Sequence, residues 1–178
     1  MCGDTTTGRA RRHHSVIRLV PADPELLNAA LAGDDALARA LGHDVVAGWV
    51  TFEGALRSLA GAPGDASWGS RLFVTEQPPE LVGWGGFKGP PRDGVVEIGY
   101  EIAEARRERG LATAAVHALV AEAFADDRVE AVIAHTLPER NASNRVLEKA
   151  GFRFDGQALE RGAVVWRFSL TRRREGDG

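Results

Sequence analysis

Residues 95–124 contain a strand, a glycine-containing turn and a helix in one continuous segment, and this order constrains the fold most strongly. Residues 95–102 read VVEIGYEI, rich in the β-branched and aromatic residues that favour strands. Residues 113–124 place apolar side chains at helical spacing, at Val116, Leu119, Val120 and Phe124. The basic turn RERGLAT, residues 107–113, joins the two. The segment predicts an α/β protein in which a strand leads directly into a helix.

The same turn is suited to bind a phosphate. The first turn of a helix leaves backbone N–H groups without partners and carries a partial positive charge, so a pyrophosphate can bind there. Gly110 and Ala112 permit close approach of the backbone. Arg107 and Arg109 add positive charge, and Thr113 offers a hydroxyl. The alternative is a plain strand–helix connection with exposed arginines. Neither a P-loop pattern nor a complete dinucleotide-binding glycine pattern occurs here, which disfavours nucleotide hydrolases and dinucleotide dehydrogenases.

Further strands and helices are predicted on both sides of this unit. Before it, strands are expected at residues 16–20, 72–74 and 81–87, and helical segments at 23–41, with a break near 33–35, and at 45–59. After it, a strand is expected at 129–134, a helix at 141–150, and strands at 152–154 and 164–170. Successive strands separated by turns indicate an antiparallel meander before the phosphate turn, which excludes the parallel order of a Rossmann oxidoreductase.

The chain has 178 residues, a formal net charge of −3 and one cysteine, Cys2. This length predicts one domain, expected at residues 15–171, with disordered segments at 1–14 and 172–178. The small net charge gives no reason to expect a nucleic-acid or membrane partner, and no apolar run is long enough to span a bilayer. A lone cysteine allows no internal disulfide, which is typical of a reducing compartment, so a cytoplasmic location is expected.

Two motifs together resemble the GNAT superfamily of N-acetyltransferases. The RxxGxA motif of residues 107–112 matches the family signature Q/R-x-x-G-x-G/A, which binds the pyrophosphate of coenzyme A. Residues 141–152, NASNRVLEKAGF, are similar to a segment of the branch that acetylates ribosomal-protein N-termini, the ribosomal-protein alanine N-acetyltransferases. The EIGYEI sequence of residues 97–102 fits that branch as well. The resemblance covers about residues 81–154 and, more loosely, the chain from residue 16 onward.

The resemblance implies a fold and an activity. The fold would be α/β, with a mixed, mostly antiparallel central sheet splayed between two parallel strands and helices on both faces. Acetyl-CoA would lie in the split and donate its acetyl group to a primary amine by direct attack in a ternary complex, with no metal. The acceptor would be a protein N-terminal α-amine or a small-molecule amine. The alternative is a degenerate module that senses acetyl-CoA. Family members occur as monomers and as dimers, so a homodimer stays open.

The residues implied to bind acetyl-CoA come from the strand, the turn and the later short helix. In the family the strand before the turn offers backbone groups to the pantetheine amides, here Ile102 and Ala103. An asparagine contacts the pantetheine arm, here Asn141. The full set is Ile102, Ala103, Arg107, Arg109, Gly110, Leu111, Ala112, Thr113, Asn141 and Arg145.

Glu97 is expected to be the general base, because several family members keep a catalytic glutamate on the strand before the turn. Glu101 shares its face of that strand and is the second choice, although either can be a solvated strand residue. Many members protonate the leaving thiolate with a tyrosine from the short helix, but this sequence has Leu147 there and its one tyrosine, Tyr100, on the strand. In the ribosomal-protein branch a serine takes that role and matches Ser143, which can equally cap the helix.

The acceptor pocket is expected between the early helices and the central strands. Trp49, Trp84 and Glu101 are its candidate lining residues, although each tryptophan can instead pack in the core. His135 lies near the end of a buried strand, where a structural role is favoured over one in the cleft. No histidines or acids show a defensible metal-binding spacing, so no metal is expected.

Overall fold

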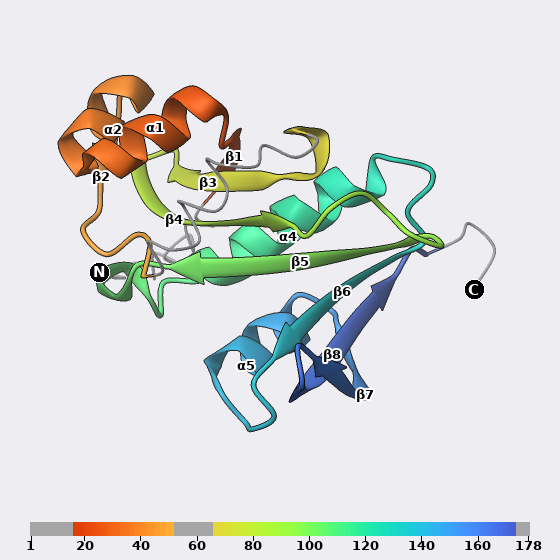
Figure 1. The fold of residues 1–178 in the computed structure, drawn as a ribbon. Helices are drawn as coiled ribbons and strands as arrows, with labels where there is room; N and C mark the ends of the chain where they lie inside the picture. Colours follow the sequence, from red (N-terminus) through yellow and green to blue (C-terminus); the bar gives the residue numbers. More distant parts are fainter. Residues whose placement is uncertain (1–15, 52–65, 174–178) are drawn as a thin grey trace, which may run out of the picture.

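The structure is a computed structural model that describes residues 16–51 and 66–173 (Figure 1). The predicted disordered segment at 1–14 and residues 174–178 of the predicted tail lie outside these ranges, as does the predicted helix at 45–59 from residue 52 onward. Across the described parts of the chain, no helix is both long and apolar enough to cross a membrane.

In the part of the chain that the structure describes, one eight-stranded sheet forms the centre of the protein. Its strand order is β1-β3-β4-β5-β6-β8-β7, and β2 pairs with β4. The strands are β1 (Ile17–Pro21), β2 (Asp44–Val45), β3 (Ser70–Thr75), β4 (Glu80–Phe87), β5 (Val95–Ile102), β6 (Ala131–Thr136), β7 (Arg153–Glu160) and β8 (Ala163–Thr171). Pairing is antiparallel except between β5 and β6 and between β2 and β4. The predicted meander and the mixed, mostly antiparallel sheet are confirmed.

The two central parallel strands separate halfway along their length. β5 and β6 pair only from Val95 opposite Ala131 to Ile98 opposite Ala134. Beyond that point β5 stays paired with β4 as far as Ile102, whereas β6 stays paired with β8. Figure 1 shows the two strands together at one end and apart at the other. The sheet therefore carries the split that the sequence predicted between two parallel neighbours.

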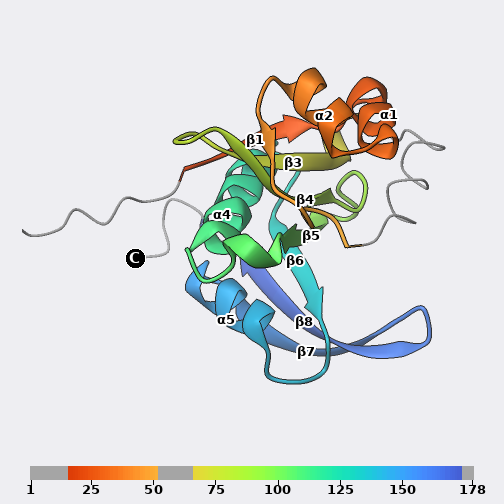
Figure 2. The same cartoon turned by 90° about the vertical axis from the view of Figure 1, so that its left-hand side faces the viewer.

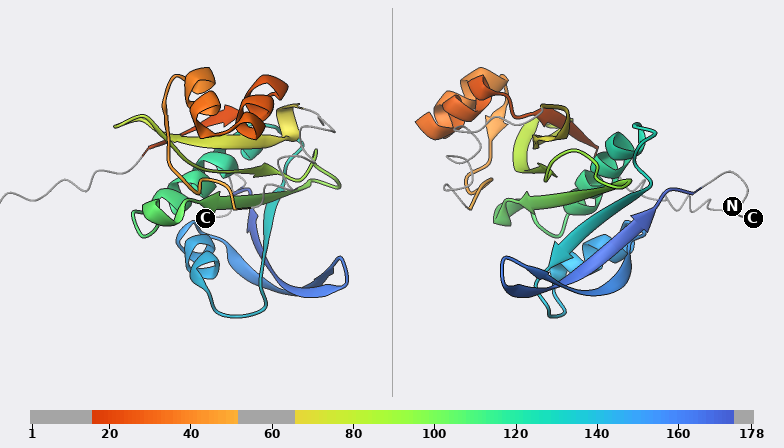
Figure 3. Two further views of the ribbon diagram at one scale, coloured as in Figure 1. Left: turned by 60° about the vertical axis from the view of Figure 1, so that its left-hand side comes forward. Right: turned by 45° about the vertical axis from the view of Figure 1, so that its right-hand side comes forward.

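Helices cover both faces of the sheet, as predicted. Strand alternation sends Leu72 and Val74 of β3 into a core cluster with residues of α1 (Pro24–Ala32) and α2 (Asp34–Leu41). Phe73, between them, joins the other cluster, formed with α4 (Leu111–Phe124) and α5 (Ala142–Lys149). These last two helices lie beside the split, and the β7–β8 hairpin projects beyond them (Figures 2 and 3).

The early helices begin and end where the sequence indicated. Asp23 caps α1 by accepting a hydrogen bond from the N–H of Leu26 at 2.8 Å, with Pro24 at the first helical position. Gly33 separates α1 from α2, in agreement with the predicted break.

The predicted helix at 45–59 is wrong over its described part. Val45 belongs to β2, and the N–H of Val46 bonds the carbonyl of Leu81 at 3.0 Å. Gly48 follows at φ 74°, in the left-handed region that glycine favours, and no helix is assigned up to residue 51. Tertiary pairing with β4 outweighs the helical spacing here. The last strands are also longer than predicted, because the 152–154 segment extends into the β7–β8 hairpin.

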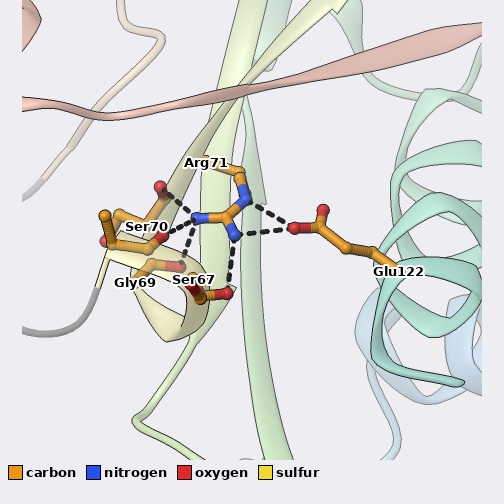
Figure 4. A network of polar contacts seen from close by, with 6 residues as sticks. Ser67, Gly69, Ser70, Arg71 and Glu122 are labelled. Carbon is orange, nitrogen blue, oxygen red and sulfur yellow. Dashed lines mark hydrogen bonds and ion pairs between the residues drawn. The ribbon is translucent and has the colours of Figure 1, made fainter. Parts of the chain in front are cut away.

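Buried Arg71 joins β3 to α4. Its side chain is 3% exposed and donates hydrogen bonds to the carbonyls of Ala66, Ser67, Gly69 and Ser70. Its Nη2 and Nε also bind Glu122 Oε1, at 2.6 and 3.0 Å (Figure 4). Arg172, just past the predicted domain end at 171, similarly bonds the carbonyls of Val129 and Asp126.

Candidate active site

The predicted phosphate turn leads into α4 without a side-chain cap. Gly110 is the N-cap residue at φ 77°, which explains the glycine, and no side chain in the described parts of the chain caps the first turn of the helix. Ala114 is the first residue whose N–H bonds back, to the carbonyl of Gly110 at 3.0 Å. The preceding N–H groups of the helix therefore remain available to a ligand. Arg107 and Arg109 are exposed beside them, so the end of α4 carries both donors and positive charge.

A third arginine, Arg106, was not foreseen from the sequence and fixes this turn to the sheet. Arg106 Nε and Nη2 bind the two carboxylate oxygens of Glu80, at 2.9 and 3.0 Å. The hydrogen bond from Arg106 and the charges of Arg106 and Arg109 hold the pKa of Glu80 below its ordinary value, against the opposing effect of burial. The turn is thereby tied to the start of β4, which keeps the N-terminus of α4 beside the split.

The backbone groups that are expected to bind the pantetheine already make hydrogen bonds within the protein. The N–H of Ala103 bonds the carbonyl of Val82 at 2.8 Å, and the carbonyl of Ile102 accepts a long hydrogen bond of 3.3 Å from Arg107 Nε. Since the Arg107 side chain is exposed, its bond to Ile102 can be exchanged for a bond to a ligand more readily than the sheet bond of Ala103.

The opposite wall of the split is the start of α5. Asn141 Oδ1 accepts from the N–H of Asn144 at 3.1 Å, and Asn144 Oδ1 accepts from the N–H of Asn141 at 2.7 Å, which completes a capping box. Asn144 Nδ2 also donates to Thr136 Oγ1 at 3.2 Å, which holds α5 on β6. The helix cap is thus Asn141, and Ser143 does not serve as the cap. Among the described residues no hydrogen bond is recorded for Asn141 Nδ2, and Arg145 is exposed on the same helix.

Glu97 sits in a cluster of charged side chains that sequence analysis only partly anticipated. Its Oε1 contacts Lys88 Nζ at 2.5 Å and His135 Nδ1 at 2.9 Å. Lys88 Nζ also binds Glu160 Oε1 at 2.8 Å. Burial lowers the pKa of Lys88, but its hydrogen bonds to Glu160 and Glu97 prevail and raise it. The bond from Lys88 correspondingly lowers the pKa of Glu160. Lys88 is therefore held as an ammonium between two carboxylates.

The same cluster contains the elements of a cation site. Ligand atoms of Glu97, His135 and Glu160 lie within 4.8 Å of one another. Lys88 Nζ touches both carboxylates and supplies the positive charge that a bound cation would otherwise provide. His135 Nε2 is buried, and none of the described residues offers it a hydrogen-bond partner. Because Nδ1 faces a carboxylate, that nitrogen is the donor, and Nε2 carries the lone pair when the ring is neutral.

Two of the three predicted acceptor residues come together. Trp84 Nε1 donates to Glu101 Oε2 at 3.0 Å, and the Thr51 hydroxyl donates to Glu101 Oε1. Trp49 is 2% exposed, donates to Asp34 Oδ1 at 3.1 Å and belongs to the α1–α2 core cluster, against which the partly buried Trp84 also packs. Burial stabilises the large apolar ring of Trp49, which is the core packing that the sequence left open as the alternative role.

The split sheet and the uncapped basic helix terminus beside it define an acyltransferase-like architecture. Residues 16–153 match the family described as "Acetyltransferase (GNAT) domain". Because this match spans most of the chain, the protein belongs to the GNAT acetyltransferase family and is an acyltransferase.

Related proteins support the same assignment. The chain is 28% identical over 154 residues to the uncharacterized N-acetyltransferase YjdG of Bacillus subtilis (strain 168), covering 81% of this chain and 90% of that one. Aminoglycoside acetyltransferase AAC(6')-Ib in complex with coenzyme A aligns with a TM-score of 0.59 at 18% identity, over 88% of this chain and 94% of its own. A chimera of spermidine N-acetyltransferase SpeG from Vibrio cholerae and hSSAT aligns with a TM-score of 0.61 at 18% identity, over 88% and 96%. These two structures show the shared fold.

Proposed function

We propose that the protein transfers the acetyl group of acetyl-CoA to a primary amine by direct attack in a ternary complex. The uncapped N-terminus of α4, placed beside the split and flanked by Arg107 and Arg109, carries this proposal. A pyrophosphate there would accept hydrogen bonds from the free N–H groups of the first turn and be favoured by the helix dipole. The aminoglycoside acetyltransferase with the same fold was solved with coenzyme A.

The remaining contacts to acetyl-CoA are proposed to come from the two walls of the split. The N–H groups of Leu111, Ala112 and Thr113 would hold the pyrophosphate. Asn141 Nδ2 and the backbone at Ile102 and Ala103 would position the pantetheine, and the exposed Arg145 would meet a phosphate. This set fits the ligand because its positive charge lies at the helix terminus and its neutral donors and acceptors lie along the split.

The chemistry requires an amine without its proton and a protonated leaving group. The amine nitrogen forms a bond to the thioester carbonyl carbon, and the C–S bond breaks. Glu97 would accept the amine proton; Lys88 and His135 hold its carboxylate at one orientation. The departing thiolate would take its proton on the α5 side of the split, where Ser143 carries its hydroxyl. This role for Ser143 rests on the resemblance of residues 141–152 to a segment of the ribosomal-protein alanine N-acetyltransferases.

The proposed acetyl-CoA site is tested by thermal unfolding with and without acetyl-CoA. At a ligand concentration about a hundredfold above Kd, binding adds about 2.7 kcal/mol, which raises the Tm by about 5–10 °C for a domain of this size. We expect this rise in the parent and its loss in an Arg107→Glu/Arg109→Glu double variant. An Arg39→Glu/Arg92→Glu variant reverses the same number of exposed charges elsewhere and should keep the rise. A parent without any rise contradicts the proposal.

A second function, an acetyl-CoA sensor without turnover, is favoured only by the missing tyrosine at Leu147. Release of free coenzyme A in the presence of an amine separates the two. Binding of acetyl-CoA without release, across peptide N-termini and small amines, would support the sensor.

A further inference from the structure

Gly99 leaves open space at the root of the split. It is the first β5 residue beyond Ile98, the last one paired with β6. Apart from its two neighbours along the chain, a Cβ built on Gly99 would meet no atom of the described residues within 4 Å, and the φ of Gly99 lies outside the left-handed region. By contrast, a Cβ on Gly83 or Gly85 would lie 2.1 and 2.3 Å from backbone oxygens of β5. Strand packing explains those two glycines, but it does not require the one at position 99.

The open space lies on the face of the sheet opposite α4. Val96, Ile98 and Ile102 point into the core cluster that includes α4. Residues 97, 99 and 101 therefore point to the other face. Across the split, His135 is on that face too, since its ring reaches Glu97. The space above Gly99 is thus bordered by two carboxylates along β5 and by an imidazole on β6.

One of these carboxylates has a charge that no cation balances within the described ranges. The hydrogen bonds recorded to Glu101 come from the Trp84 indole and the Thr51 hydroxyl, which are both neutral donors. Glu97, at the other end, already binds the ammonium of Lys88. A positively charged group entering beside Gly99 would therefore find its counter-charge at Glu101.

We propose that the absence of a side chain at Gly99 leaves an opening through which the acceptor amine reaches the split, and that Glu101, at the edge of this opening, selects small amines that carry a second positive charge. The inference rests on the proposed function and names its substrate class. The donor is expected to bind from the α4 side, so an amine that attacks the thioester must approach from the opposite face. The Gly99 opening is on that face, one residue past the point where the strands part.

Substitution of Gly99 tests the opening. Valine suits a strand and fills the space with a branched side chain, and alanine fills it partly. With spermidine as the probe amine, we expect kcat/KM to fall about 100-fold in Gly99→Val and less in Gly99→Ala, because even small misplacement of a reacting group is costly. The acetyl-CoA-induced rise in Tm should persist in both variants. Ala131→Val adds two of the three carbon atoms that Gly99→Val adds, on the same face of the sheet but in the paired part of β6, and should leave kcat/KM unchanged.

Substitution of Glu101 tests the charge selection. We expect Glu101→Gln to raise KM for spermidine at least about tenfold and to leave KM for n-butylamine, which carries one charge, nearly unchanged. Equal effects on both amines would overturn the selection by charge. A Gly99→Val variant with the parental kcat/KM would overturn the proposal that the amine enters beside Gly99. A parent protein that binds acetyl-CoA and acetylates peptide N-termini but not spermidine would overturn the proposed substrate class. Failure of the parent to bind acetyl-CoA would instead count against the proposed function.

Discussion

The hydroxyl of Tyr100 donates a hydrogen bond to the backbone carbonyl of Ser143 at 3.2 Å, and so joins β5 to α5 across the split. Tyr100 is the chain's one tyrosine. Although Tyr100 lies on a strand, its hydroxyl reaches the first turn of the short helix α5. Because the bond connects the two walls between which acetyl-CoA is proposed to lie, Tyr100 helps to set their separation.

Replacement of Tyr100 by phenylalanine should lower stability at pH 8 by about 1 kcal/mol. The change removes one hydrogen bond and leaves the Ser143 carbonyl without its donor, but it keeps the ring. For a domain of this size we expect the Tm to fall by about 2–4 °C. Ser143→Ala retains the backbone carbonyl and serves as the control, with no comparable loss. Thermal unfolding of the three proteins checks the prediction.

The same tyrosine predicts a loss of stability at alkaline pH. Burial raises the pKa of Tyr100 to about 12 from an ordinary value of 10.0. The folded state thus favours the neutral phenol, and this contribution is fully present below pH 10 and is lost as the pH rises toward 12. A difference of this size corresponds to about 2–3 kcal/mol. Denaturant unfolding between pH 8 and 11.5 should show a steeper decline in the parent than in Tyr100→Phe, and parallel curves would contradict the assignment.

Arg71→Met should destabilise the fold by about 3 kcal/mol. The variant keeps a similar length of apolar chain but removes every hydrogen bond that Arg71 makes to the turn at residues 66–70, and leaves Glu122 unpaired. Glu122 is 37% exposed, so solvent limits the cost of losing its partner. We expect a fall in Tm of about 6–12 °C. Glu122→Gln keeps an acceptor for the guanidinium and should cost about 1 kcal/mol; equal losses in the two variants would show that the carbonyl contacts contribute little.

The effect of Glu97→Gln should depend on the acceptor. An α-amine, with a pKa of about 7.7–8.0, is roughly one-tenth neutral at pH 7, whereas an amine with a pKa near 10.4 is neutral about once in a few thousand molecules. Loss of the base should lower kcat/KM by about 100-fold or more for spermidine and by less than about tenfold for an alanine-terminated peptide. Coenzyme A release measures both rates, with exposed Glu76→Gln as the control. An equal loss for the two acceptors would argue against Glu97 as the base.

The parts of the site that could be predicted from sequence are those formed by contiguous residues. The RxxGxA turn and the capped helix at residues 142–149 depend on local backbone geometry, which local sequence specifies. Lys88 and Glu160 could not be associated with Glu97, because the β4–β5 turn and the β7–β8 hairpin bring them together only in the folded sheet. The error in the predicted helix over its described part, residues 45–51, has the same origin, since pairing of β2 with β4 is a long-range contact.

Gly85→Ala should destabilise the protein strongly, whereas Gly99→Ala should not. An added Cβ at position 85 would lie 2.3 Å from the carbonyl oxygen of Gly99 and 2.6 Å from the ring of Phe73, so β4 and β5 would have to move apart in the core. We expect a loss of about 2–3 kcal/mol, in the upper range for overpacking. At Gly99 the Cβ meets none of the described residues within 4 Å, so alanine there should be neutral or slightly stabilising through the unfolded state. Urea unfolding of both variants measures the difference. A large loss in Gly99→Ala would mean that the space above Gly99 is filled in solution.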